Sequence, residues 1–192
     1  MIECRRMIAM KKFILKALIL VGLCMTIVAK ACATEKTVKI GEKSPDFTLP
    51  DQDNTQQTLS AIYKNSWVIV YFYPSDDTPG CTKQACSLRD KYVDFKTLNI
   101  TILGISYNSV QSHKDFKNKY HLPFTLLSDN EKKVATAYGA KNWWFLPFPK
   151  RMTFIIDQAG IIRNIMDNVD VTTHGQDIIT KIKQLQAQPN TH

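Results

Sequence analysis

The segment WVIVYFYPSDDTPGCTKQAC, residues 67–86, joins a strongly apolar run to two cysteines that lie five positions apart. Residues 67–73 are apolar on both faces, which is typical of a strand in the middle of a sheet. Pro79 and Gly80 end the strand pattern, so Cys81 falls at or just before the first turn of the helix expected to follow. A turn alone does not require two thiols. The segment therefore predicts a staple, a metal site or a reactive site.

The residues that follow predict a βαβ unit. Apolar side chains at helical spacing indicate one helix from position 81 or 82 to position 98. These side chains are Leu88, Tyr92, Phe95 and Leu98. A second buried strand, ITILGIS, is expected at residues 100–106. A strand, a helix and a strand in about 40 residues make a right-handed parallel crossover.

The remaining patterns complete an α/β fold. The expected elements are a hairpin in residues 47–59, a polar helix near 111–120, a strand at 124–129, a short helix near 132–138, an antiparallel hairpin of 151–157 with 161–167, and a last helix through 178–185 that Thr172 or Thr173 caps. A parallel βαβ unit followed by ββα is the element order of a thioredoxin-like sandwich. We therefore expect a central mixed β-sheet flanked by helices, with an N-terminal β-hairpin.

The first 33 residues have the three parts of a secretory signal peptide. Lys11 and Lys12 precede an apolar core at residues 17–29, and the segment ends in Ala-Cys-Ala at 31–33. We predict cleavage after Ala33, with Met10 as a possible alternative start. A single domain of residues 34–192 would then be exported, into the periplasm of a bacterium. The alternatives are an uncleaved anchor and, less well matched, a lipoprotein attached through Cys32.

Removing this leader changes both the charge and the cysteine count. The whole chain has a net charge of +8, but the leader holds 6 of the 25 Lys and Arg and 1 of the 17 Asp and Glu, which leaves 19 − 16 = +3. A domain this close to neutral predicts neither nucleic-acid binding nor stable membrane association after cleavage. Only Cys81 and Cys86 stay in the mature chain.

The positions of the two remaining cysteines indicate chemistry at Cys81. Free N–H groups and the positive end of the helix dipole favour a thiolate at a helix start. Thr78 offers a hydroxyl that can donate to sulfur or to a bound oxygen atom. On a continuous helix, Cys81 and Cys86 would have Cα atoms roughly 8.6 Å apart, whereas a disulfide needs less than about 7 Å. A bond between them requires a non-helical segment or local unwinding, which favours a transient bond over a static one.

These residues also carry a family resemblance. The pattern P-x-x-x-T-x-x-C, formed by Pro74, Thr78 and Cys81, resembles the active-site signature of peroxiredoxins. TPGCTKQACSLRD, with a second cysteine five residues later, is similar to the bacterioferritin-comigratory, or Q-type, branch of that family. The likeness extends to SPDFTLPDQD, ILGIS, FTLLSD and KRMTFIID, and so covers most of the predicted mature chain.

The resemblance implies a role for each matched residue. Cys81 corresponds to the peroxidatic cysteine, which becomes a sulfenic acid, and Cys86 to the resolving cysteine, which forms a disulfide with it. Pro74 shields the thiolate from water, Thr78 orients the peroxide, and Arg151 stabilises negative charge. The implied substrates are hydrogen peroxide and organic hydroperoxides, and a thioredoxin-like protein would be the reductant. No cofactor or metal is implied, and the branch includes monomers and dimers, so we expect a monomer or a weak homodimer.

Other interpretations stay open at this stage. The two cysteines fit a permanent disulfide or, less well, a zinc site. An exported thiol–disulfide oxidoreductase acting on protein cysteines is the rival enzyme, although such enzymes usually carry C-x-x-C. Polar neighbours predict that His113, His121, His174 and His192 are surface residues. The segment NWWFLPFP, residues 142–149, fits a loop that covers the core or an exposed apolar patch for a partner, a dimer contact or a wall of the peroxide pocket.

Overall fold

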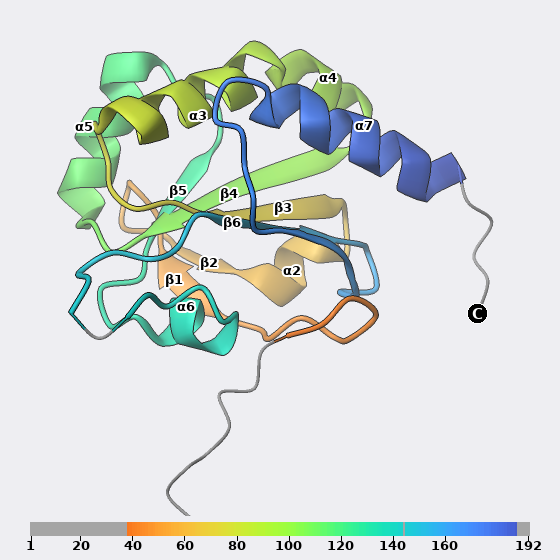
Figure 1. The fold of residues 1–192 in the computed structure, drawn as a ribbon, viewed down its shortest axis with the longest axis horizontal. Helices are drawn as coiled ribbons and strands as arrows, with labels where there is room; N and C mark the ends of the chain where they lie inside the picture. Colours follow the sequence, from red (N-terminus) through yellow and green to blue (C-terminus); the bar gives the residue numbers. More distant parts are fainter. Residues whose placement is uncertain (1–37, 144, 188–192) are drawn as a thin grey trace, which may run out of the picture. The chain divides into compact units, whose positions relative to one another are not determined.

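A computed structural model describes residues 38–143 and 145–187 (Figure 1). The predicted signal peptide, residues 1–33, lies outside the described residues, and so do His192 and Trp144. Cleavage after Ala33 and the start of a domain at Thr34 stay predictions. Within the described ranges, no helix is both long and apolar enough to cross a membrane.

The centre of the fold is a mixed five-stranded sheet with the order β5-β4-β3-β6-β7. Its strands are β3 (Trp67–Phe72), β4 (Ile100–Ser106), β5 (Thr125–Ser128), β6 (Met152–Ile156) and β7 (Ile162–Met166). β4 pairs in parallel with both β3 and β5, whereas β6 pairs antiparallel with β3 and β7. The predicted crossover and the predicted C-terminal hairpin are confirmed. The apolar strand that opened the sequence argument is the middle strand of the sheet, buried from Val68 onward.

The N-terminal hairpin is also confirmed, as a separate two-stranded sheet. It consists of β1 (Thr48–Pro50) and β2 (Gln56–Thr58), paired antiparallel. Asp51 forms the turn, because its Oδ1 accepts hydrogen bonds from the backbone N–H groups of Asp53 and Thr55, each at 2.9 Å. Such local carboxylate bonds are what make Asp a turn residue.

Helices cover both faces of the sheet (Figure 1). They are α2 (Leu59–Tyr63), α3 (Pro79–Asp90), α4 (Tyr92–Thr97), α5 (Val110–Tyr120), α6 (Lys133–Ala137) and α7 (His174–Ala187). One core cluster joins α3, α4, α5 and α7 to the sheet face that carries Ile69, Tyr71 and Ile155. The other joins α2 and α6 to the face that carries Val68 and Phe72. The alternation along β3 therefore separates two apolar cores.

The predicted helix of residues 81–98 was wrong in two respects. It begins earlier, at Pro79, which occupies the first helical position that proline tolerates. It is also interrupted at Lys91, whose φ of −105° and ψ of 9° separate α3 from α4. The apolar spacing continues across the break, so periodicity gave no sign of it. At the other end of the chain, α7 begins at His174, directly after Thr173, whose hydroxyl donates to the Asp177 carboxylate at 2.7 Å.

Candidate active site

Cys81 lies in the first turn of α3, as the sequence predicted. It is the third residue of the helix and its side chain is 2% exposed, packed in the core cluster beneath α3 and α7. At this position the backbone N–H groups have no acceptor within the helix, and the helix dipole presents its positive end. The sulfur thus meets a local field that favours negative charge.

Arg151 supplies a full positive charge to the same sulfur. It directly precedes β6, and its Nη2 donates to Cys81 Sγ at 3.4 Å. The guanidinium lies close to the backbone of the first helical turn, because a Cβ added to Gly80 would be 3.5 Å from the same Nη2. The structure therefore brings together two residues that the sequence places 70 positions apart.

Behind the arginine lies a chain of buried polar groups that the sequence analysis missed. The second terminal nitrogen of the Arg151 guanidinium, Nη1, donates to Gln84 Oε1. Gln84 Nε2 is 3.0 Å from His174 Nδ1, and His174 Nε2 is 3.0 Å from Thr153 Oγ1. Gln84, His174 and Thr153 are each fully buried. Polar groups in such a position are satisfied only by one another, so their orientations are fixed.

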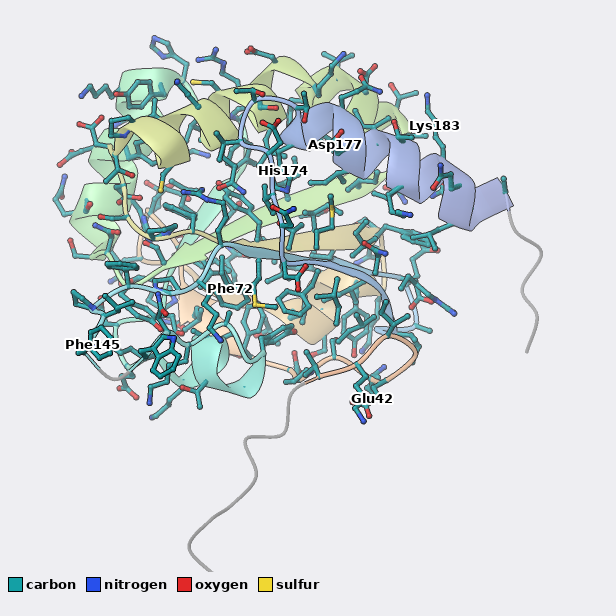
Figure 2. The ribbon with its side chains drawn as sticks, in the orientation of Figure 1. Glu42, Phe72, Phe145, His174, Asp177 and Lys183 are labelled. Atoms are coloured by element: carbon teal, nitrogen blue, oxygen red, sulfur yellow. The ribbon has the colours of Figure 1, made fainter. Side chains whose placement is uncertain are left out.

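The prediction that the histidines lie on the surface was wrong for two of them. His174, at the start of α7, and His113, on α5, are both fully buried (Figure 2 labels His174). Burial and the nearby positive charge of Arg151 lower the pKa of His174 from 6.5 to about 4. The ring is therefore neutral near pH 7. Polar neighbours in sequence gave no sign of burial, because the partners come from other elements.

Cys86 lies on the same uninterrupted helix as Cys81 and is partly exposed. Both cysteines are free thiols. Five residues along a helix bring a rise of about 7.5 Å, so the two sulfurs cannot bond in this conformation. The sequence analysis left two possibilities, a non-helical segment or a helix that unwinds locally. Because the segment is helical, α3 must unwind before a disulfide can form.

The other two signature residues border the helix start. Thr78 is the residue before α3, and its hydroxyl donates to the Ser75 carbonyl oxygen at 3.1 Å, so the predicted bond to sulfur is not the one made here. Pro74 follows the strand β3 and is partly buried. Both lie in the short loop that delivers Cys81 to its position.

A buried cluster of hydrogen bonds around Asp76 anchors this loop. Asp76 Oδ2 is 3.0 Å from His113 Nδ1, and Tyr73 and Ser112 each donate a hydroxyl to the same carboxylate, at 2.7 and 2.6 Å. The Asp76 backbone N–H donates to Asn108 Oδ1 at 3.1 Å. The loop between β3 and α3 is therefore tied to α5 and to the end of β4, which limits its movement.

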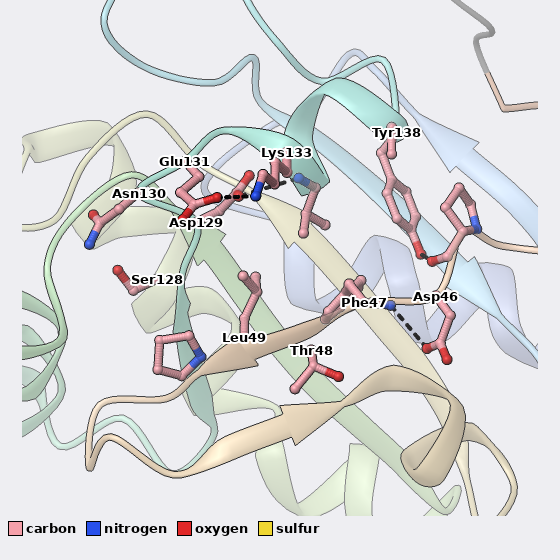
Figure 3. A pocket seen from close by; sticks show the side chains of 14 residues that line it. Asp46, Phe47, Thr48, Leu49, Ser128, Asp129, Asn130, Glu131, Lys133 and Tyr138 are labelled. Atoms are coloured by element: carbon pink, nitrogen blue, oxygen red, sulfur yellow. Dashed lines mark hydrogen bonds and ion pairs between the residues drawn. The ribbon is translucent and has the colours of Figure 1, made fainter.

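A cleft lies elsewhere, against the core of the opposite sheet face. It has a volume of about 590 Å³ and is lined by residues 45–50 and by residues of the β5–α6 region (Figure 3). Asp129 borders it, and burial raises the pKa of this carboxyl although the N–H groups of Val134 and Ala135 donate to it. None of the predicted site residues lines the cleft.

The aromatic segment 142–149 does not cover the core with all its rings. Trp143 is 69% exposed and Phe145 is 60% exposed, with ring centroids 6.3 Å apart. Only Pro149 of the described part of this segment is buried. The segment ends just before Lys150 and Arg151, so its exposed rings belong to the loop that leads into the site. Its function stays a prediction.

Within residues 38–143 and 145–187, no three His, Cys, Asp or Glu side chains are grouped so that they could hold a metal ion. Instead, the arrangement is that of a sulfur nucleophile. A buried cysteine at a helix start, against an arginine and on an α/β sandwich, is the kind of arrangement from which thiol-based redox sites are built.

Comparison with known proteins specifies the family. Residues 40–165 match the AhpC/TSA family. The putative peroxiredoxin bcp of Coxiella burnetii is 40% identical over 151 residues, which cover 76% of this chain and 99% of that protein. The chain therefore belongs to the AhpC/TSA family of peroxiredoxins, and its relatives are of the Q and bacterioferritin-comigratory type.

Two further matches agree. The putative chloroplastic peroxiredoxin Q of Oryza sativa subsp. indica is 47% identical over 131 residues, which cover 68% of this chain and 60% of that protein. The chain thus spans less than two thirds of this relative. The solved bacterioferritin comigratory protein of Xanthomonas campestris superposes with a TM-score of 0.67 at 29% identity, covering 72% of this chain and 91% of that one. The predicted thioredoxin-like peroxiredoxin fold is confirmed.

Proposed function

We propose that this protein is a thiol peroxidase that reduces hydrogen peroxide and organic hydroperoxides, with Cys81 as the nucleophile. The observation that carries the proposal is the Cys81 sulfur in the first turn of α3, 3.4 Å from the Arg151 guanidinium. A fixed cation at this distance stabilises a thiolate and the negative charge that develops on the oxygens of a reacting peroxide. The Xanthomonas campestris relative is described as having alkyl peroxide reduction activity, which supports this substrate class.

The first step is a displacement at oxygen. The Cys81 thiolate attacks the terminal oxygen of ROOH, the S–O bond forms as the O–O bond breaks, and the leaving alkoxide takes a proton. Sulfur is oxidised to the sulfenic acid and the peroxide is reduced to ROH. Thr78 and Pro74, which flank the helix start, orient the peroxide and limit access of water to the sulfur.

The second step forms the disulfide. The Cys86 thiolate attacks the Cys81 sulfenic sulfur, and hydroxide leaves and takes a proton to give water. Because α3 is continuous through both cysteines, the turn between them must unwind first. A thioredoxin-like protein then returns two electrons as two thiols and is itself oxidised. No cofactor enters this cycle. A monomer or a weak homodimer suffices for it, because both cysteines belong to one chain.

Substitution of each cysteine separates this cycle from its rivals. Cys81→Ser is expected to abolish peroxide consumption in the presence of reductant, because Cys81 carries the sulfur that lies against Arg151. Cys86→Ser is expected to reduce one equivalent of peroxide and to stop as a Cys81 sulfenic acid, which mass spectrometry and a sulfenic-acid trap detect. A Cys81→Ser protein that still consumes peroxide with reductant would refute the assignment. Faster exchange with protein disulfides than with peroxide would favour the thiol–disulfide oxidoreductase.

We also propose that residues 1–33 direct the protein out of the bacterial cytoplasm into the periplasm. The proposal rests on the Lys11–Lys12 pair, the apolar core and the Ala-x-Ala end of this segment. N-terminal sequencing of the protein from fractionated cells tests it. A mature chain that begins at or near Thr34 in the periplasmic fraction is expected, and an intact N-terminus in the cytoplasm would contradict it.

A further inference from the structure

Gln84 lies between the two cysteines, inside the segment that must unwind, and both ends of its amide are engaged. Arginine carries only donors, so the amide oxygen must face Arg151 and the Nε2 group must face His174. This orientation makes His174 Nδ1 the acceptor and places the ring proton on Nε2, which donates to Thr153 Oγ1. The neutral His174 tautomer with its proton on Nε2 is therefore compatible with every hydrogen bond from Arg151 to Thr153.

The surroundings of His174 preserve that tautomer. Gln84 faces the ring from α3 and Thr153 from β6, and the Tyr71 ring of β3 lies edgewise at 6.3 Å. The charged group nearby is Arg151, which disfavours a second positive charge on the ring. A protonated His174 would lose its acceptor at Nδ1, so the bond to Gln84 depends on the neutral ring.

The helix that carries His174 is a fixed support. Its buried side chains Ile178, Ile179 and Ile182 belong to the core cluster under α3. The Gly175 N–H donates to Ser87 Oγ at 3.0 Å, and a Cβ added to Gly175 would lie only 2.4 Å from the Ser87 carbonyl oxygen. Glycine thus lets the first turn of α7 approach α3 closely, directly beside the bond between His174 and Gln84. Figure 2 shows His174 at this end of α7.

We propose that His174 is a positioning residue that acts through Gln84 as a latch on the segment between the cysteines. While the bond between them is made, α3 stays helical and Arg151 stays against Cys81. The bond must break before Cys86 can reach the sulfenic acid. The inference rests on the proposed peroxidase cycle and adds to it a residue from α7 that touches neither the sulfur nor the peroxide.

The strength of the latch decides between two reactions of the Cys81 sulfenic acid. Either α3 unwinds and Cys86 forms the disulfide, or a second ROOH meets the folded site. In the second case the sulfenic sulfur attacks the peroxide, the O–O bond breaks, and the products are a sulfinic acid and ROH. A stronger latch favours the sulfinic acid, and a weaker latch favours the disulfide. His174 would therefore tune sensitivity to excess peroxide.

The experiment measures both steps in the purified wild-type protein and in His174→Phe. Stopped-flow mixing with hydrogen peroxide gives the rate of the first oxidation, and acid quench with mass spectrometry gives the rates of disulfide and sulfinic acid formation. We expect disulfide formation to be roughly three- to tenfold faster in His174→Phe, about the factor that one buried hydrogen bond supplies. The sulfinic fraction should fall, and the first oxidation should slow, because Arg151 loses the orientation that Gln84 gives it.

Two variants separate positioning from a general loss of stability. His174→Asn keeps an oxygen acceptor near the place of Nδ1 and is expected to restore the wild-type partition. Ile182→Val weakens the packing of α7 without touching the polar chain and should leave the partition unchanged. If His174→Phe does not fold, Gln84→Met removes the same bond from the other side and must give the same shift.

The outcomes are distinct. An unchanged partition in the folded latch variants, or equal effects of His174→Asn and His174→Phe, would overturn the latch. Failure of the wild-type protein to form any sulfenic acid at Cys81 would instead refute the peroxidase proposal.

Discussion

His113 and His174 are equally buried, yet their ring nitrogens face opposite kinds of partner. His113 Nδ1 faces the Asp76 carboxylate at 3.0 Å and its Nε2 faces the Leu127 carbonyl oxygen at 3.1 Å, so both of its ring nitrogens face acceptors. His174 faces an amide donor at Nδ1 and a hydroxyl at Nε2, so it satisfies both as a neutral ring. The partner atoms, and not burial alone, decide what a buried histidine does.

The different partners of His113 and His174 match what each held segment must do in the proposed cycle. The pair of His113 and Asp76 holds the loop that enters α3, and this loop does not need to move during the proposed cycle. His174 holds Gln84, in the segment that does need to unwind. A hydrogen bond to a buried carboxylate is costlier to break than a hydrogen bond between neutral groups. The fixed part of the site thus has the stronger anchor.

The largest expected effect comes from removing the two rings in turn. His113→Phe should lower the free energy of unfolding by about 2–4 kcal/mol, because it leaves both the buried Asp76 carboxylate and the Leu127 carbonyl oxygen without a donor. His174→Phe should lower it by about 1–3 kcal/mol, because it leaves only neutral polar groups without a partner. Urea denaturation at pH 7 measures both. Equal losses would mean that the carboxylate partner of His113 adds nothing to its contribution.

A pH series sharpens the same contrast. Burial and Arg151 lower the pKa of His174 from 6.5 to about 4, so below pH 6.5 the unfolded chain gains a proton that the folded chain does not. The stability from His174 is complete above pH 6.5 and is lost as the pH falls to about 4. The loss approaches roughly 3 kcal/mol. Urea denaturation of wild type and His174→Asn from pH 7.5 to 4.5 isolates this contribution, and parallel curves would contradict it.

Sequence patterns predicted what depends on local order. The two-sided apolar strand, the proline–glycine break and the spacing of the cysteines predicted the βαβ unit, the site of Cys81 and the need for unwinding. Arg151 is different, because nothing near it in sequence distinguishes it from a surface charge at a strand end. Only the family resemblance singled it out, and the structure places it 3.4 Å from the sulfur.

Contacts between elements that are far apart in the sequence could not be predicted from local patterns. His174 receives its partners from α3 and β6, and His113 from the loop before α3 and from β5. Polar neighbours in sequence suggested solvent for both rings, and no periodicity encodes a partner 90 positions away. The break at Lys91 was missed for a related reason, since the apolar spacing fits one helix as well as two.

A smaller effect is expected at the contact that supports the latch. Gly175→Ala places a methyl group 2.4 Å from the Ser87 carbonyl oxygen, so α7 must shift away from α3. Overpacking of this kind costs about 1–3 kcal/mol, and the shift should also lengthen the bond between Gln84 and His174. We expect faster disulfide formation together with the loss of stability. Thr180→Ala, on the exposed side of α7, is the control, and a Gly175→Ala protein with wild-type kinetics would separate helix packing from the latch.

The smallest effect is expected from Thr153, the last hydroxyl of the His174 cluster, and the matching hydroxyl of Ser112 in the Asp76 cluster sets its scale. Thr153→Val removes the acceptor of His174 Nε2–H, a bond between neutral groups that contributes about 0.5–1.5 kcal/mol. Ser112→Ala removes a donor to the Asp76 carboxylate, a bond to a charged group that contributes about 1.5–3 kcal/mol. Both changes delete a hydroxyl without removing either histidine. The order of their effects therefore compares a hydrogen bond to a carboxylate with one between neutral groups.

Urea denaturation and the rate of disulfide formation distinguish the two substitutions. Ser112→Ala should reduce stability more and leave disulfide formation unchanged, because the loop before α3 is not part of the segment that unwinds. Thr153→Val should reduce stability less but speed disulfide formation by about twofold, because a His174 ring without its acceptor is less firmly oriented toward Gln84. The reverse pattern would mean that the loop, and not α7, restrains the helix between the cysteines.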